Sequence, residues 1–182
     1  MTSESQSGAA QPPGEAVPRT ALAGKYMTFK LSSEEYGLEI LKVREIIGLM
    51  DITRVPRTQE FVRGVINLRG KVIPVVDLRL KFGMPRTDAT DQTVIIVVQY
   101  SMNGADLTMG ILVDEVVEVL DIAADHIEPA PSFGMNAADT SFILGVGKAD
   151  KRMIFLLEIG RVLTSEEIGG LAAAPNRLTG TA

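Results

Sequence analysis

The chain has 182 residues, 46% of them hydrophobic and 5% aromatic, so it is long enough to bury an aliphatic core. A net charge of −5 without any run of basic residues argues against a nucleic-acid partner, and the lack of cysteine excludes disulfides, thiolate metal sites and cysteine nucleophiles. The longest strictly apolar runs, such as Val94–Val98, are too short to span a membrane. We therefore expect a soluble cytoplasmic protein that does not insert directly into the membrane.

The two ends of the chain differ in composition from its middle. Residues 1–24 are rich in Ser, Gly, Ala, Pro and Gln and have no apolar period, which predicts a disordered leader. Residues 169–182 predict a loose C-terminal tail. The folded unit is therefore expected over residues 25–168.

The folded unit is dominated by short stretches that are rich in β-branched residues and bounded by turn residues. Ten strands are predicted, at Tyr26–Leu31, Tyr36–Ile40, Glu45–Met50, Gly64–Leu68, Val72–Asp77, Thr93–Tyr100, Leu107–Val113, Val116–Asp121, Phe142–Lys148 and Arg152–Glu158. Hairpin turns are expected at Arg69-Gly70, Asn103-Gly104 and Ala149-Asp150. Pro74 lacks a backbone N–H, which predicts an edge or a bulge at that position.

Helices are predicted to be few and short. One begins at Thr58 and ends at Arg63, and a single turn at Leu78–Phe82 is capped by Asp77 and closed by Gly83. A capping-box pattern predicts a terminal helix from Thr164. Because long crossover helices are missing, the pattern predicts an all-β fold.

The polar stretch Gly83–Asp91 has five predicted strands on each side. We expect two packed five-stranded barrels, the first over about residues 25–84 and the second over about residues 92–158. Each half is too small to bury much surface alone, so the two should share one core. Exchange of strands between the halves stays open.

Catalytic chemistry has little support in the sequence. The chain has one histidine, His126, in a segment at Ala123–Ile127 that reads as a turn, and we interpret it as a surface or cap residue. The carboxylates are scattered along the chain and are interpreted as solvated or, for Asp77, as a helix cap. No catalytic, metal or cofactor residue is predicted, and we expect a protein that is not an enzyme and works through its surfaces.

Residues 52–81 read ITRVPRTQEFVRGVINLRGKVIPVVDLRLK. This segment resembles the CheW family, the adaptors of bacterial chemotaxis arrays, through its GxxNLRG and VIPVxDLR patterns. The residues EYGL at 35–38, ILKVREI at 40–46 and IEPAP at 127–131 resemble further family segments. The resemblance covers roughly residues 25–168. It implies two SH3-like five-stranded barrels.

The resemblance also implies a function. CheW-family adaptors couple the cytoplasmic hairpin tip of chemoreceptors to the regulatory domain of the histidine kinase CheA. The resemblance also allows further CheW copies, assembled in rings, as partners. The alternatives are an adaptor for a non-motility histidine kinase and a small-ligand-binding β-barrel regulator.

Two sets of surface residues follow from the resemblance. The receptor-binding set is Ile40, Val43, Glu45, Ile46, Arg69 and Gly70, in which Glu45 and Arg69 pair with each other or with receptor charges. The kinase-binding set is Val113, Asp114, Val116 and Val119. For the apolar members of both sets, inward core packing is the alternative interpretation.

Overall fold

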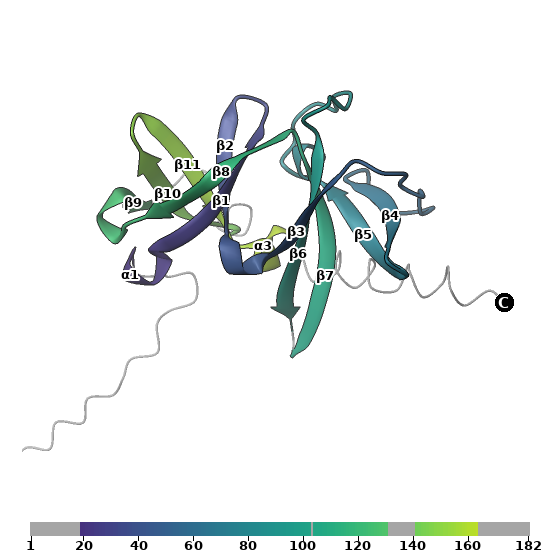
Figure 1. The fold of residues 1–182 in the computed structure, drawn as a ribbon, viewed down its shortest axis with the longest axis horizontal. Helices are drawn as coiled ribbons and strands as arrows, with labels where there is room; N and C mark the ends of the chain where they lie inside the picture. The colour runs from purple at the N-terminus through teal and green to yellow at the C-terminus, as the bar shows by residue number, and fades with distance from the viewer. Residues whose placement is uncertain (1–18, 103, 131–140, 164–182) are drawn as a thin grey trace, which may run out of the picture.

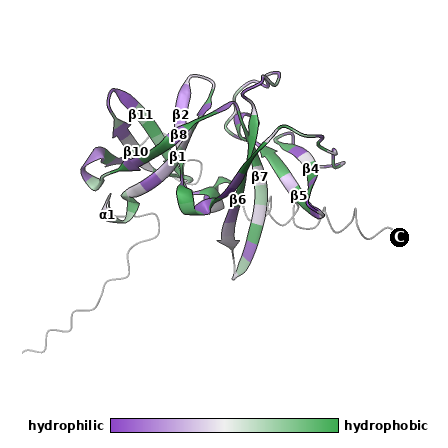
Figure 2. Ribbon diagram, viewed as in Figure 1, coloured by the Kyte–Doolittle hydropathy of each residue, from purple (hydrophilic) through white to green (hydrophobic). Residues whose placement is uncertain are grey.

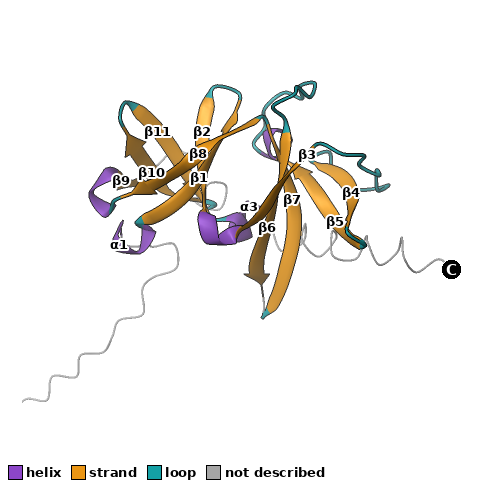
Figure 3. Cartoon of the chain, in the orientation of Figure 1, coloured by secondary structure: helices purple, strands orange, loops and turns teal. Residues whose placement is uncertain are grey.

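The computed structural model describes residues 19–102, 104–130 and 141–163 and consists mainly of β-strands (Figure 3). The strands are β1 (Gly24–Leu31), β2 (Glu34–Glu39), β3 (Val43–Gly48), β4 (Val62–Leu68), β5 (Lys71–Asp77), β6 (Val94–Met102), β7 (Ala105–Val113), β8 (Glu115–Ile122), β9 (Ile127–Pro129), β10 (Ile143–Ala149) and β11 (Arg152–Leu157). Short helices lie between them, namely α1 (Arg19–Leu22), η1 (Ile40–Lys42), α2 (Leu78–Lys81), η2 (Ala124–His126) and α3 (Ile159–Val162). The predicted all-β class is confirmed.

The strands form two sheets that lie side by side (Figure 1). Sheet A has the order β8-β1-β2-β11-β10-β9, and sheet B has the order β3-β6-β7-β5-β4. Strand exchange therefore occurs, and the predicted division into barrels at 25–84 and 92–158 is wrong. Strands β1 and β2 lie beside the C-terminal strands because β2 pairs in parallel with β11.

Arg152 supports this parallel pairing. Its guanidinium donates to both carboxylate oxygens of Glu35 on β2, at 2.8 Å each, and to Glu118 on β8 at 2.9 Å. Glu35 and Arg152, which lie 117 residues apart in sequence, thus meet in one sheet.

The folded unit begins earlier than expected. Helix α1 starts at Arg19, and Leu22, at 4% exposure, packs into the interior of sheet A with Tyr26 and Ile127. The expected boundary after residue 24 is therefore too late, since burial of Leu22 holds this turn against the sheet. Residues 1–18, the tail at 169–182 and the helix expected from Thr164 lie outside the described residues.

One large cluster of buried side chains joins the two sheets. Its members include Met27, Phe29 and Leu38 from sheet A and Ile96, Val98 and Ile111 from sheet B. Smaller clusters fill the interior of each sheet separately. Figure 2 shows hydrophobic residues concentrated along the strands and hydrophilic residues nearer the turns. The predicted shared core is confirmed.

Two local predictions fail for identifiable reasons. The segment Thr58–Arg63 is not a helix, because the Thr58 hydroxyl donates to Val55 O instead of capping, and the chain enters β4 at Val62. Burial of Phe61 and Val62 against the central cluster favours this extended entry. The other failure is β9, whose three residues make sheet A six-stranded where five strands were expected.

Other local predictions are confirmed or refined. Asp77 caps α2 by accepting from the backbone N–H groups of Arg79 and Leu80, at 3.0 and 3.4 Å. Pro74 lies in an interior strand, but the pairing of β5 with β7 begins only at Val75. Pro74 therefore needs no hydrogen-bond partner on that side.

Candidate functional site

The predicted receptor-binding residues gather where the chain passes from sheet A to sheet B. Helix η1 makes this passage and leads into β3, an edge strand of sheet B. Ile40 and Val43 are half-buried against the central cluster, whereas Ile46 is 41% exposed. The core-packing interpretation therefore holds in part for Ile40 and Val43, and Ile46 presents its side chain to solvent.

Glu45 and Arg69 form a bidentate ion pair in the structure. The Arg69 guanidinium nitrogens donate to the two carboxylate oxygens of Glu45 at 2.5 and 2.8 Å. Glu45 lies on β3 and Arg69 lies in the turn between β4 and β5, so the pair connects opposite edges of sheet B. Both side chains reach solvent, with 29% of Glu45 and 71% of Arg69 exposed. The predicted pairing with each other is confirmed.

The hydrogen bond from Arg69 lowers the pKa of Glu45 below its ordinary value of 4.5, and the charge of Arg69 adds to this effect. A lowered carboxyl pKa means that the pair stabilises the fold above pH 4.5 and that this contribution is lost as the pH falls through the folded-state pKa. We expect Arg69→Met to return the Glu45 midpoint toward 4.5 in an NMR titration of side-chain carboxyls. An unchanged Glu45 titration midpoint in the Arg69→Met variant would show that Glu45 and Arg69 do not form an ion pair in solution.

The hairpin that carries Arg69 has backbone geometry that its sequence explains. Arg69 and Gly70 have φ values of +52° and +86°, the combination that a two-residue type I′ turn requires. The side chain of Asn67 accepts a hydrogen bond from Gly70 N at 2.9 Å. The NLRG sequence therefore builds a fixed turn from which Arg69 reaches Glu45.

The second predicted set does not form one exposed surface. Val113 is 1% exposed and belongs to the central cluster, so the prediction that it contacts a partner is wrong. The end of β7 is buried because it lies between the two sheets. Val116 is half-buried against the same cluster. Only Val119, at 50% exposure, offers a large apolar side chain to solvent.

Asp114 joins the two sheets. It lies between β7 of sheet B and β8 of sheet A, and its backbone N–H donates to Lys30 O at 3.1 Å. Its carboxylate accepts from Ser32 N at 2.7 Å and from the Arg79 guanidinium at 2.5 Å. Asp114 was expected at a partner surface, and the structure gives it these internal contacts.

A family model described as "CheW-like domain" matches residues 25–167. This chain belongs to the CheW-like domain family. The "Chemotaxis protein CheW" of Klebsiella aerogenes is 40% identical over 144 residues, which cover 79% of this chain and 84% of that protein. That of Bacillus subtilis is 34% identical over 142 residues, covering 78% and 88%.

A solved structure agrees with this assignment. The crystal structure of the scaffolding protein TtCheW from Thermoanaerobacter tengcongensis matches with a TM-score of 0.69 and 36% identity, covering 80% of this chain and 95% of that one. The CheW-family resemblance predicted from the motifs is therefore confirmed, and the family match ends within one residue of the expected folded unit.

Some exposed apolar residues of this CheW-family chain escape sequence analysis. Leu41, at 92% exposure, is the most exposed large hydrophobic residue in the described part of the chain, and Leu49, Met50 and Met153 are 45%, 37% and 59% exposed. Leu41 lies in η1, where strand alternation is interrupted. Its position directly after the predicted strand at Tyr36–Ile40 is the one sequence feature that could have indicated its exposure.

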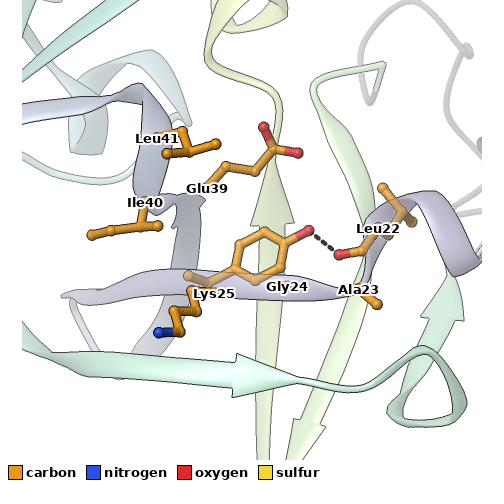
Figure 4. A pocket seen from close by; sticks show the side chains of 8 residues that line it. Leu22, Ala23, Gly24, Lys25, Glu39, Ile40 and Leu41 are labelled. Carbon is orange, nitrogen blue, oxygen red and sulfur yellow. Dashed lines mark hydrogen bonds between the residues drawn. The ribbon is translucent and has the colours of Figure 1, made fainter.

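A pocket of about 380 Å³ lies beside Leu41 (Figure 4). Its walls come from the chain between α1 and β1 and from the end of β2 with η1, and they are formed by Leu22, Ala23, Gly24, Lys25, Tyr26, Glu39, Ile40 and Leu41. The Tyr26 hydroxyl donates to Leu22 O at 2.5 Å and fixes one wall. Of the residues that line this pocket, only Ile40 belongs to a surface predicted from the sequence.

Metal and membrane features are limited in the described residues. Over residues 19–102, 104–130 and 141–163, no group of three or more His, Asp or Glu side chains is placed to hold a metal ion. The same residues form no helix of the length and apolarity needed to cross a bilayer. His126 is the last residue of the short helix η2 and is exposed, which fits the interpretation as a surface residue, whereas the caps of η2 are Ala123 and Ile127.

Proposed function

We propose that this chain is a non-catalytic chemotaxis adaptor that couples the cytoplasmic tip of chemoreceptors to the regulatory domain of the histidine kinase CheA. The observation that carries this proposal is membership of the CheW-like family together with the exposed β3 surface beside the Glu45–Arg69 pair. Relatives named chemotaxis protein CheW and a scaffolding protein of the same fold support it. The protein would then work in the cytoplasm, at receptor arrays, with no cofactor.

The receptor face would use the residues around η1 and β3. Ile46 and the solvent-facing parts of Ile40 and Val43 supply apolar contact, which suits the apolar face of a receptor helix. Glu45 and Arg69 supply charges held in one geometry beside it. A preformed ion pair at the edge of an apolar patch favours orientation and specificity more than affinity.

The kinase face would centre on Val119 rather than on the whole predicted set. Val119 is the exposed member, and Val116 has a half-buried side chain three residues earlier on β8. Asp114 would support this face indirectly, by holding the start of β8 against α2 through Arg79. Binding both partners at once would raise the effective concentration of the kinase at the receptor tip. Further copies in rings would extend the same arrangement.

Calorimetric titration with the regulatory domain of CheA and with a receptor-tip fragment tests the proposal. We expect Arg69→Glu to weaken receptor-tip binding by about tenfold or more, because it places two negative charges together at the interface. Kinase binding and Tm should change little, since an exposed ion pair contributes little to stability.

Lys71→Glu is the matched control, because it makes the same charge change at an exposed position of the same hairpin. Equal losses of receptor binding in the two variants would show that Arg69 acts only through the net charge of the hairpin and makes no specific contact with the receptor. A wild-type protein that binds neither fragment would overturn the adaptor proposal and direct attention to other histidine kinases.

A further inference from the structure

The pocket between α1 and η1 combines apolar walls with a carboxylate, Glu39, that has no ion-pair partner among the described residues. Leu22, Ile40 and Leu41 form aliphatic walls, and Leu41 is almost fully exposed at its rim. Glu39 lines the same pocket and is half-buried. A half-buried carboxylate beside aliphatic surface favours a cation that brings its own apolar stem.

A second carboxylate, Glu158, does not line the pocket but acts on the Tyr26 ring that does. Burial raises the pKa of Tyr26 to about 12, and the negative charges of Glu39 and Glu158 contribute to this rise. Both glutamates therefore act on the Tyr26 ring that lines the pocket. Within the described part of the chain, neither carboxylate has a hydrogen-bond or ion-pair partner.

Lys25 does not neutralise these charges. It lines the pocket, but Figure 4 shows its ammonium and the Glu39 carboxylate at opposite sides of the pocket. The neighbouring residues 1–18 contain Glu4 and Glu15 and no Lys or Arg, so their side-chain charge does not complement the pocket either. A cation supplied by a partner would complement the Glu39 carboxylate.

We propose that this pocket is a docking point for a protein partner that inserts one Arg or Lys side chain, flanked by aliphatic residues, between α1 and η1. The ammonium or guanidinium would face Glu39, and the aliphatic neighbours would cover Leu22, Ile40 and Leu41. Arg suits the site better than Lys, because its planar fork binds carboxylates bidentately and loses less hydration. The pocket borders the receptor face proposed above, since both include Ile40 of η1, and the inference adds an Arg or Lys side chain as the group that enters it.

NMR of the ¹⁵N-labelled full chain tests this docking point with two probes, the capped tripeptides acetyl-Leu-Arg-Leu-amide and acetyl-Leu-Glu-Leu-amide. We expect the arginine peptide to shift the backbone amides of Gly24, Lys25 and residues 39–41 in a saturable manner, and the glutamate peptide to leave them unchanged. Equal shifts with both peptides, or none with either, would overturn the proposal.

Matched variants locate the charge. Glu39→Gln should weaken binding of the arginine peptide by about three- to fivefold, the range for a partly exposed ion pair, and Glu158→Gln by less. Glu34→Gln, at an exposed position at the other end of β2, should leave the affinity unchanged. Leu41→Ala should weaken binding without loss of spectral dispersion, since its side chain is almost fully exposed.

Two outcomes would point elsewhere. An unchanged affinity in Glu39→Gln would overturn the assigned role of the carboxylate. Nuclear Overhauser contacts between residues 1–18 and Leu41 in the free protein would identify the chain's own leader as the occupant and would likewise overturn the proposal.

Discussion

Replacing Gly64 by Ala is expected to destabilise the fold by at least about 3 kcal/mol. Gly64 has a φ of +140°, which residues with a side chain rarely adopt, and an added Cβ would lie 2.1 Å from the carbonyl oxygen of Thr53. Thr53 cannot simply move away, because it exchanges two backbone hydrogen bonds of 2.8 Å with Val65. Urea denaturation of the full chain measures the change in the free energy of unfolding.

Gly48→Ala is the control for this substitution. An added Cβ at Gly48 meets no atom within 4 Å, so we expect a change of no more than about 0.5 kcal/mol at this surface position. A Gly64→Ala protein as stable as the Gly48→Ala protein would show that Thr53 does not pair with Val65 in solution.

Replacing Asp77 by Ala is expected to cost about 2–4 kcal/mol. Asp77 is 4% exposed and holds two structures together. One carboxylate oxygen caps α2, and the other accepts from the Arg63 guanidinium of β4 at 3.1 Å. Removing the carboxylate leaves the α2 amides uncapped and takes from Arg63 a partner that is shielded from water.

Two further variants separate these contributions. Asp77→Asn keeps an oxygen for the cap but loses the charge facing Arg63, so its cost should fall between those of Asp77→Ala and wild type. Asp106→Ala removes an exposed carboxylate that accepts only from Ser101, and we expect a change within about 0.5 kcal/mol. If Asp106→Ala and Asp77→Ala cost the same, the buried network contributes nothing specific.

Sequence patterns predict the local elements of this protein well. All ten predicted strands exist, because each combines β-branched residues with turn residues at its ends. The Asp77 cap and the Arg69-Gly70 turn are also predictable, since their chemistry acts over a few residues. The short strand β9 escapes because it has three residues and ends in Pro129, which reads as a turn.

Partner choice between strands cannot be predicted in the same way. The exchange of β1 and β2 into sheet A depends on the parallel pairing of β2 with β11, and nothing in either segment alone identifies the other. The same limit applies to Val113. Alternation predicts one exposed face for β7, but contact with both sheets buries residues 109–113 consecutively.

The candidate site likewise has one part that the sequence predicts and one part that it does not predict. The Glu45–Arg69 pair was predicted because family motifs mark both residues, and the geometry confirms their contact. The pocket beside η1 was not predicted, because it combines residues 22–26 with residues 39–41. The sequence patterns of these two segments predict only the disordered leader and strands, and they do not predict a contact between the segments. The exposure of the Leu41 side chain is apparent only from the three-dimensional structure.

The pairing of β2 with β11 has a consequence for synthesis on the ribosome. Strands β1 and β2 emerge first, yet one of their neighbours in sheet A lies 117 residues further along the chain. Sheet B draws all its strands from residues 43–113, so it is able to close while the first hairpin still exposes one edge. Nascent chains of this fold therefore carry an unpaired hairpin edge during translation, a feature that favours slow completion and gives chaperones a window in which to act.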